Sequence, residues 1–115
     1  MTIALVLFAL AALGGVTIAA MRLRGAERPP TALALAHGAL AAAGLIALIL
    51  AVVGMTDPGL ARTALVVFLV AAVIGFYLFA QHMQKKAIPI PVMLVHGLVA
   101  VVAFVILLVV VTHAA

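Results

Sequence analysis

Four long apolar runs, separated by short polar connections, make up most of the chain. They cover residues 2–21, 31–54, 63–81 and 92–112. Each run approaches the roughly 20 residues that an α-helix needs to cross the ~30 Å hydrocarbon core of a bilayer. Prolines and glycines fall between the runs, where they end helices and favour turns. The pattern predicts four transmembrane helices that cross the membrane up, down, up and down.

The composition makes lipid the solvent of these helices. Of the 115 residues, 70% are hydrophobic and 7% are charged, and the mean hydropathy is +1.57. A soluble domain of this length leaves too much of its surface in water to hide so many apolar side chains. We therefore expect a single all-α domain over residues 1–115, a four-helix transmembrane bundle embedded in a lipid bilayer.

The few polar residues exclude several functional classes. The net charge of +4 comes from residues in short connections, which is not the distribution of a nucleic-acid-binding surface. The sequence contains no cysteine and no serine, and its two acidic residues, Glu27 and Asp57, lie in connections. Hydrolytic and nucleophilic catalysis therefore lack candidate residues. The small multidrug resistance transporters, of similar length, depend on a glutamate inside the membrane, which these four runs do not contain.

Basic residues predict the orientation in the membrane. Five of the six lie in the first and third connections, namely Arg22, Arg24, Arg28, Lys85 and Lys86. Cytoplasmic connections of membrane proteins carry an excess of Lys and Arg, so these two are predicted to be cytoplasmic and both termini to lie outside. We expect a bacterial inner membrane as the location. Basic residues follow the first run instead of preceding it, so it is predicted to be a mature helix and not a signal peptide.

Two stretches of the chain share a proline and a His-Gly pair at the same spacing. They are PTALALAHG at residues 30–38 and PIPVMLVHG at residues 89–97, and the offset between them is 59. The chain is therefore interpreted as two copies of one helical hairpin, with halves at about residues 1–56 and 57–115. An even number of spans in each copy makes these parallel repeats, related by a pseudo-twofold axis along the membrane normal.

The repeat places His37 and His96 at equal depth, roughly 10 Å inside the cytoplasmic boundary at 1.5 Å per residue. The second and fourth helices of such a bundle are diagonal partners, so both imidazole rings are expected to face the bundle axis and each other. Glycines are expected at this height on all four helices: Gly14, Gly15, Gly38, Gly75 and Gly97. The missing side chains leave room for a flat, bulky ligand.

Two facing imidazoles inside a membrane indicate a shared ligand, because ionisable residues in transmembrane helices usually serve a function. Haem b is the ligand that we expect, with His37 and His96 as its two iron ligands and one haem per chain. Backbone carbonyls one turn earlier, near Leu33 and Val92, are expected to accept a hydrogen bond from the second ring nitrogen. The haem propionates require nearby cations, which are available in Arg22, Arg24, Arg28, Lys85 and Lys86.

The paired His-Gly elements on alternate helices resemble those of small four-helix membrane b-type cytochromes. The resemblance covers the helices over residues 31–54 and 92–112. It implies single-electron transfer by a carrier rather than catalysis by an enzyme, with a redox partner subunit or a quinone as partner. Those families often hold two haems at opposite membrane faces. Here His113 is the one histidine near the outer face, so a single haem is expected.

Three alternatives remain open. In the first, the protein is an accessory or anchor subunit of a larger respiratory or photosynthetic complex. In the second, each histidine singly ligates a chlorin-type pigment or a metal ion. In the third, the histidines only link helices by hydrogen bonds. Zinc and copper are disfavoured because no carboxylate, thiolate or further histidine is level with the pair. His82, at a helix end, is interpreted as an interfacial residue with Leu23 as its counterpart. The apolar outer faces also permit a homo-oligomer.

Overall fold

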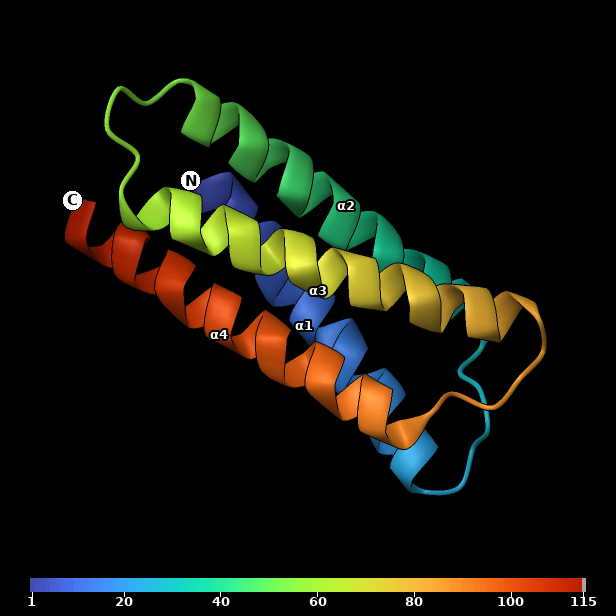
Figure 1. Cartoon of the computed structure of the whole chain (residues 1–115). Helices are drawn as coiled ribbons and strands as arrows, with labels where there is room; N and C mark the ends of the chain where they lie inside the picture. Colours follow the sequence, from blue (N-terminus) through green and yellow to red (C-terminus); the bar gives the residue numbers. More distant parts are fainter. Residues whose placement is uncertain (115) are drawn as a thin grey trace.

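The computed structural model describes residues 1–114, which form four helices and, within that range, no strand. The helices are α1 (Thr2–Leu23), α2 (Thr31–Val53), α3 (Leu60–Met83) and α4 (Ile90–Ala114). They run antiparallel, each beside the next, in a bundle of 45 × 20 × 19 Å (Figure 1). The predicted all-α, up-down-up-down bundle is confirmed. Most helices extend a few residues beyond the apolar runs, as at Arg62, whose long side chain can reach the polar end of the bundle.

The outer surface of the bundle is apolar along its length. All four helices are long and hydrophobic enough to cross a membrane. Large aliphatic and aromatic side chains point outward, for example Ile3, Val53 and Phe76, which are 72%, 78% and 74% exposed. Exposed apolar patches of this extent are not stable in water. The chain is therefore an integral membrane protein whose outer side chains contact lipid.

The four helices pack as two hairpins. Contacts are dense between α1 and α2 and between α3 and α4, and sparser along the α1/α4 and α2/α3 seams. Consequently α1 and α3 occupy one diagonal of the bundle and α2 and α4 the other, as expected. The connections at residues 24–30 and 84–89 lie at one end of the bundle, called here the two-connection end. The opposite end carries the connection at residues 54–59 and the start of α1 (Figure 1).

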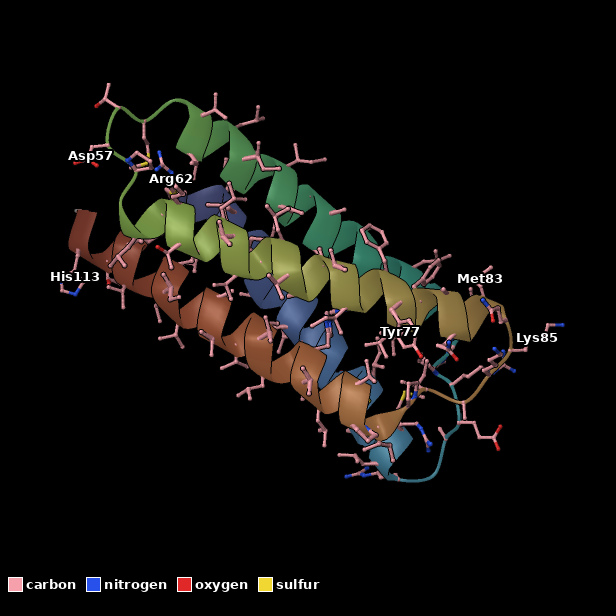
Figure 2. The ribbon with its side chains drawn as sticks, viewed as in Figure 1. Asp57, Arg62, Tyr77, Met83, Lys85 and His113 are labelled. Atoms are coloured by element: carbon pink, nitrogen blue, oxygen red, sulfur yellow. The ribbon has the colours of Figure 1, made fainter. Side chains whose placement is uncertain are left out.

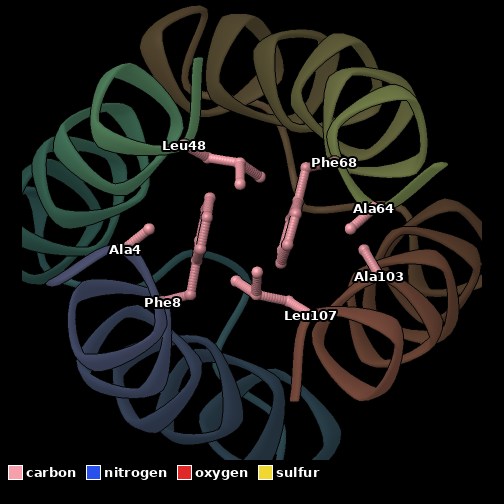
Figure 3. Close-up of a cluster of buried hydrophobic side chains, with 7 residues drawn as sticks. All are labelled: Ala4, Phe8, Leu48, Ala64, Phe68, Ala103 and Leu107. Carbon is pink, nitrogen blue, oxygen red and sulfur yellow. The ribbon is translucent and has the colours of Figure 1, made fainter. Parts of the chain in front are cut away.

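The tightest core lies away from the two-connection end. Phe8 of α1 and Phe68 of α3 stack face to face, with ring centres 3.7 Å apart and planes 5° from parallel. Leu48 and Leu107 close this stack from the other diagonal, and both are fully buried. Figure 3 shows the two rings edge-on, with one leucine at each side of the stack. A Cβ on Gly44 would lie 3.2 Å from the Phe8 ring, so the glycine lets this ring pack closely against α2.

Buried positions repeat between the hairpins, which confirms the internal repeat. Ala4, Phe8 and Ala11 in α1 match Ala64, Phe68 and Ala71 in α3, and Leu48 in α2 matches Leu107 in α4. The offset is therefore 60 in the first helix of each hairpin and 59 in the second. The single offset of 59 expected from the sequence is wrong for α1 and α3. The connection at residues 84–89 is one residue shorter than that at 24–30, which accounts for the change.

The first helix of each hairpin ends in the same way. Gly25 and Lys85, equivalent at an offset of 60, both have positive φ, at 111° and 59°. In each turn the next amide bonds a carbonyl five residues back, Ala26 to Met21 and Lys86 to Gln81, both at 3.0 Å. This is the 6→1 bond of a Schellman cap, in which glycine is the favoured residue. Lys85 adopts the same conformation at a cost of about 1 kcal/mol.

Candidate functional site

His37 of α2 and His96 of α4 meet inside the bundle. Their ring centres are 6.3 Å apart and their planes make an angle of 86°. Both rings are partly buried, and both line one cavity between the hairpins. The prediction that the two imidazoles face each other across the bundle axis is confirmed.

One nitrogen of each ring is engaged by the antiparallel helix of the same hairpin. His37 Nδ1 lies 2.7 Å from the Ala11 carbonyl oxygen, and His96 Nδ1 lies 2.9 Å from that of Ala71. A carbonyl oxygen only accepts, so Nδ1 carries the proton and donates in both rings. The Nε2 atom of each neutral ring then keeps its lone pair, which is the form that a metal binds.

The expected carbonyl partners near Leu33 and Val92 are therefore wrong. The side chain of a histidine inside a bundle points away from its own helix axis and toward the neighbouring helix. The methyl groups of Ala11 and Ala71 are small enough for the rings to approach the backbone there. Each half of the histidine pair is thus positioned within its own hairpin.

Three of the five predicted glycines make room for the imidazoles. A Cβ on Gly15 would lie 3.0 Å from His37 Cε1, and one on Gly75 would lie 3.1 Å from His96 Cε1. A Cβ on Gly14 would lie 3.4 Å from His37 Cβ. These residues are level with the histidines, as predicted. The space that they leave is filled by the rings.

The other two glycines border open space. No described atom lies within 4 Å of a Cβ built on Gly38 or Gly97. Both glycines directly follow a site histidine and line the same cavity. The positions that follow the two histidines are therefore not crowded by other side chains.

The cavity between the hairpins has a volume of about 960 Å³ and is lined by all four helices. It reaches from the Phe8/Phe68 stack to Pro29 and Ile88 at the two-connection end. Of its 33 lining residues, 14 are glycine or alanine, and among residues 1–114 its only titratable side chains are histidines, namely His37, His82 and His96. A large apolar cavity with a few converging polar groups is typical of a cofactor site.

The cavity extends toward lipid along the two sparse seams. Its lining includes the outward-facing Leu35 and Phe76 on the α2/α3 side, which are 53% and 74% exposed. On the α1/α4 side it includes Val16 and Leu94, which are 69% and 53% exposed. A ligand in this space would lie between the two hairpins, with its edges directed at the seams.

His82 is a third histidine of the cavity, and its burial was missed from the sequence. The side chain is 4% exposed, and its Nε2 lies 3.2 Å from Thr31 Oγ1. Its ring stacks on Phe79, with centres 6.2 Å apart. Its Nδ1 has no hydrogen-bond partner in the described part of the chain. At the offset of 60, the residue of α1 that is equivalent to His82 is Arg22 and not Leu23. This equivalence is the sequence signal that could have drawn attention to His82.

The predicted propionate cations all lie at the two-connection end, the end of His82. Figure 2 shows Lys85 and Met83 there, and Asp57, Arg62 and His113 at the other end. Arg22 Nε donates to the Ile88 carbonyl oxygen at 2.7 Å, and the Ile88 amide donates to the Glu27 carbonyl oxygen at 2.9 Å. The remaining cations, Arg24, Arg28, Lys85 and Lys86, are exposed in the connections. None of these basic residues lines the cavity itself.

Among residues 1–114 no three His, Cys, Asp or Glu side chains are close enough to hold a metal ion together. The arrangement therefore brings two imidazole rings together beside one apolar cavity. Comparison with protein-family models, with curated proteins and with solved structures finds no match to this chain. The fold is that of a four-helix transmembrane bundle built from two hairpins. The function is inferred from the geometry of the histidine pair.

Proposed function

We propose that this protein is a membrane b-type cytochrome that holds one haem b between His37 and His96 and transfers single electrons. The observation that carries the proposal is the relation between the two rings. Both Nδ1 atoms donate to backbone carbonyls, so both Nε2 atoms have free lone pairs beside one apolar cavity. Two neutral imidazoles are the axial ligands of low-spin, six-coordinate haem.

The separation of the rings supports coordination of one iron by both. Metal–imidazole bonds are about 2.0–2.1 Å long and a ring nitrogen lies roughly 1.1 Å from the ring centre, so coaxial rings on one ion have centres about 6.3 Å apart. The ring centres in this structure are 6.3 Å apart and their planes make an angle of 86°. Both values are compatible with two rings that bind one iron with their planes crossed.

The cavity supports a planar macrocycle rather than a bare ion. Its volume of about 960 Å³ exceeds the needs of a single ion, and its glycines and alanines leave space beside both rings. The Phe8/Phe68 stack closes the space on one side, and the basic two-connection end lies on the other, where carboxylates can be compensated. When bound, haem supplies reversible one-electron chemistry, with a potential that depends on its axial ligands and on burial.

The protein would act in the membrane as an electron carrier. By the excess of basic residues, we place the two-connection end in the cytoplasm and both termini outside, in a bacterial inner membrane. The haem would then be nearer to the cytoplasmic face. A redox partner subunit or a quinone would exchange electrons with it through the seams or the basic end.

The visible spectrum tests the proposal directly. The protein is purified in detergent from haem-replete cells, and its spectrum is recorded before and after reduction with dithionite. A sharp α band and a shifted Soret band on reduction are expected, with one haem per chain by the pyridine haemochrome assay. A colourless, stable protein that also fails to take up added haem b would contradict the proposal and favour an anchor subunit.

A further inference from the structure

Among residues 1–114, His82 is the only polar residue that is buried, and it does not belong to the His37/His96 pair. A buried nitrogen without a hydrogen-bond partner costs about 1–3 kcal/mol. His82 Nδ1 is such an atom in the described chain, although the side chain is 96% buried and lines the cavity. A polar group from a ligand in the cavity would remove that cost.

The second nitrogen of His82 is compatible with Nδ1 as a donor. Thr31 Oγ1 lies 3.2 Å from Nε2 and can donate its hydroxyl proton to it. Nε2 then accepts, and the proton of the neutral ring resides on Nδ1. The ring is held in place by Phe79, on which it stacks with planes 17° from parallel. His82 lines the cavity with its ring, and that ring carries an oriented N–H that is itself buried and has no partner in the described chain.

The height of His82 matches one edge of a macrocycle centred on the histidine pair. Gly75 is level with His96, because its Cβ would lie 3.1 Å from the His96 ring. His82 comes seven residues later on the same helix, roughly 10 Å further toward the two-connection end at 1.5 Å per residue. That separation is comparable to the reach from a haem iron to a propionate oxygen together with one hydrogen bond.

The internal repeat supplies a second polar group at the same height. Arg22 follows Gly15 in α1 by seven residues, as His82 follows Gly75 in α3. Arg22 reaches the other hairpin through Nε, which donates to the Ile88 carbonyl oxygen, and His82 reaches it through Thr31. The two propionates of haem b lie side by side on one edge of the macrocycle. A pseudo-twofold axis through that edge would direct one of them to each hairpin.

We propose that His82 Nδ1 donates a hydrogen bond to one propionate carboxylate and so fixes the rotation of the macrocycle in the cavity. This inference rests on the proposed function, because it requires haem b between His37 and His96. His82 is a positioning residue that would bind the periphery of the ligand, whereas Arg22, at the matching height on α1, lies outside the lining of the cavity. The expected specificity is for a porphyrin that carries free carboxylates on one edge.

The experiment compares haem b with its dimethyl ester, in which both carboxylates are blocked. Each is titrated into the ligand-free full-length protein in detergent, and the dissociation constants are obtained from the low-spin Soret band. The wild-type protein should prefer haem b. His82→Leu should reduce this preference by about 10-fold or more, the effect of losing one hydrogen bond to a charged group. Gln84→Leu, at an exposed residue of the same end, is the matched control and should keep the wild-type preference.

Two polar variants guard against a folding defect in His82→Leu. Asn places its amide nitrogen near the position of Nδ1, so His82→Asn should retain most of the preference for haem b. Gln places its amide near Nε2, so His82→Gln should lose it. A wild-type preference in His82→Gln, or an equal loss of affinity for both ligands in His82→Leu, would overturn the role of His82 and leave the proposed function intact. Failure of the wild-type protein to bind either porphyrin would overturn both.

Discussion

His37 and His96 are 59 positions apart in the chain, yet their imidazole centres are 6.3 Å apart inside the bundle. Each ring is oriented by a carbonyl of its own hairpin, at Ala11 and at Ala71. The distance between the rings is consequently set by how the two hairpins pack. Such a pair is organised before any ligand binds, which lowers the cost of ordering the site on binding.

Removal of either histidine of the pair should abolish the low-spin spectrum. His37→Ala and His96→Ala each leave at most one axial nitrogen, so a bound haem becomes five-coordinate or is lost. The measurement is the reduced-minus-oxidised spectrum of purified variants. His113→Ala, at an exposed residue of the other end, should retain the wild-type spectrum. Retention of the low-spin bands in either variant of the pair would show that the ligand assignment is wrong.

Alanine at the two kinds of glycine should have opposite effects on the ligand-free protein. Gly15→Ala brings a Cβ to 3.0 Å from His37 Cε1 and must displace the ring, at a cost of about 1–3 kcal/mol. Gly38→Ala meets no described atom and should stabilise α2 by up to about 1 kcal/mol. Unfolding in mixed detergent micelles measures both.

Haem affinity of the glycine variants then distinguishes a glycine that makes room for a histidine ring from a glycine that contacts the ligand. If a macrocycle lies over Gly38, Gly38→Ala should weaken haem binding while leaving the ligand-free protein at least as stable as the wild type. Gly97→Ala is the symmetric test in the second hairpin. Unchanged haem affinity in both variants would place the ligand elsewhere in the cavity.

Core packing should depend on which side of α2 a leucine occupies. Leu48 is fully buried against the phenylalanine stack, whereas Leu50, two residues later, is 69% exposed to lipid. Leu48→Ala should destabilise the bundle by on the order of 2 kcal/mol, because packing contacts are lost and a void remains. Leu50→Ala removes the same atoms from a lipid-facing position and should change stability by less than about 0.5 kcal/mol. Equal effects in the unfolding measurement would contradict the packing described for α2.

The orientation can be measured with single cysteines, because the sequence contains none. Ala87→Cys lies in the exposed connection at the two-connection end, and Thr56→Cys lies in the connection between α2 and α3. A membrane-impermeant maleimide added to intact cells should label Thr56→Cys and spare Ala87→Cys. The reverse pattern would invert the orientation that the basic residues predict.

The fold was predictable because each helix coincides with a long apolar run, and prolines and glycines lie in the connections between the runs. The diagonal placement of His37 and His96 followed from the order of the helices and the short connections. The position of Gly15 and Gly75 at the height of the histidine pair followed from counting residues along antiparallel helices. These features depend on spacing along the chain, which a sequence displays directly.

The hydrogen-bond partners and the third histidine were not predictable in the same way. Every residue has a carbonyl, so the choice of Ala11 over Leu33 depends on how far each helix is rotated about its axis. Helices that are apolar on all sides carry little sequence signal for that rotation. His82 lies at a helix end, where a histidine is usually solvated, and its burial results from the packing of Phe79 and Thr31 around it.

Each hairpin supplies one imidazole of the His37/His96 pair, the carbonyl that orients it and a glycine that leaves room for it. A single hairpin that paired with an identical copy across the same axis would assemble every one of these contacts. The chain thus has the internal organisation of a homodimer whose two subunits have been joined by the connection at residues 54–59. Joining the subunits also allows them to diverge, and the shared position occupied by Arg22 in one half and His82 in the other is where they have done so.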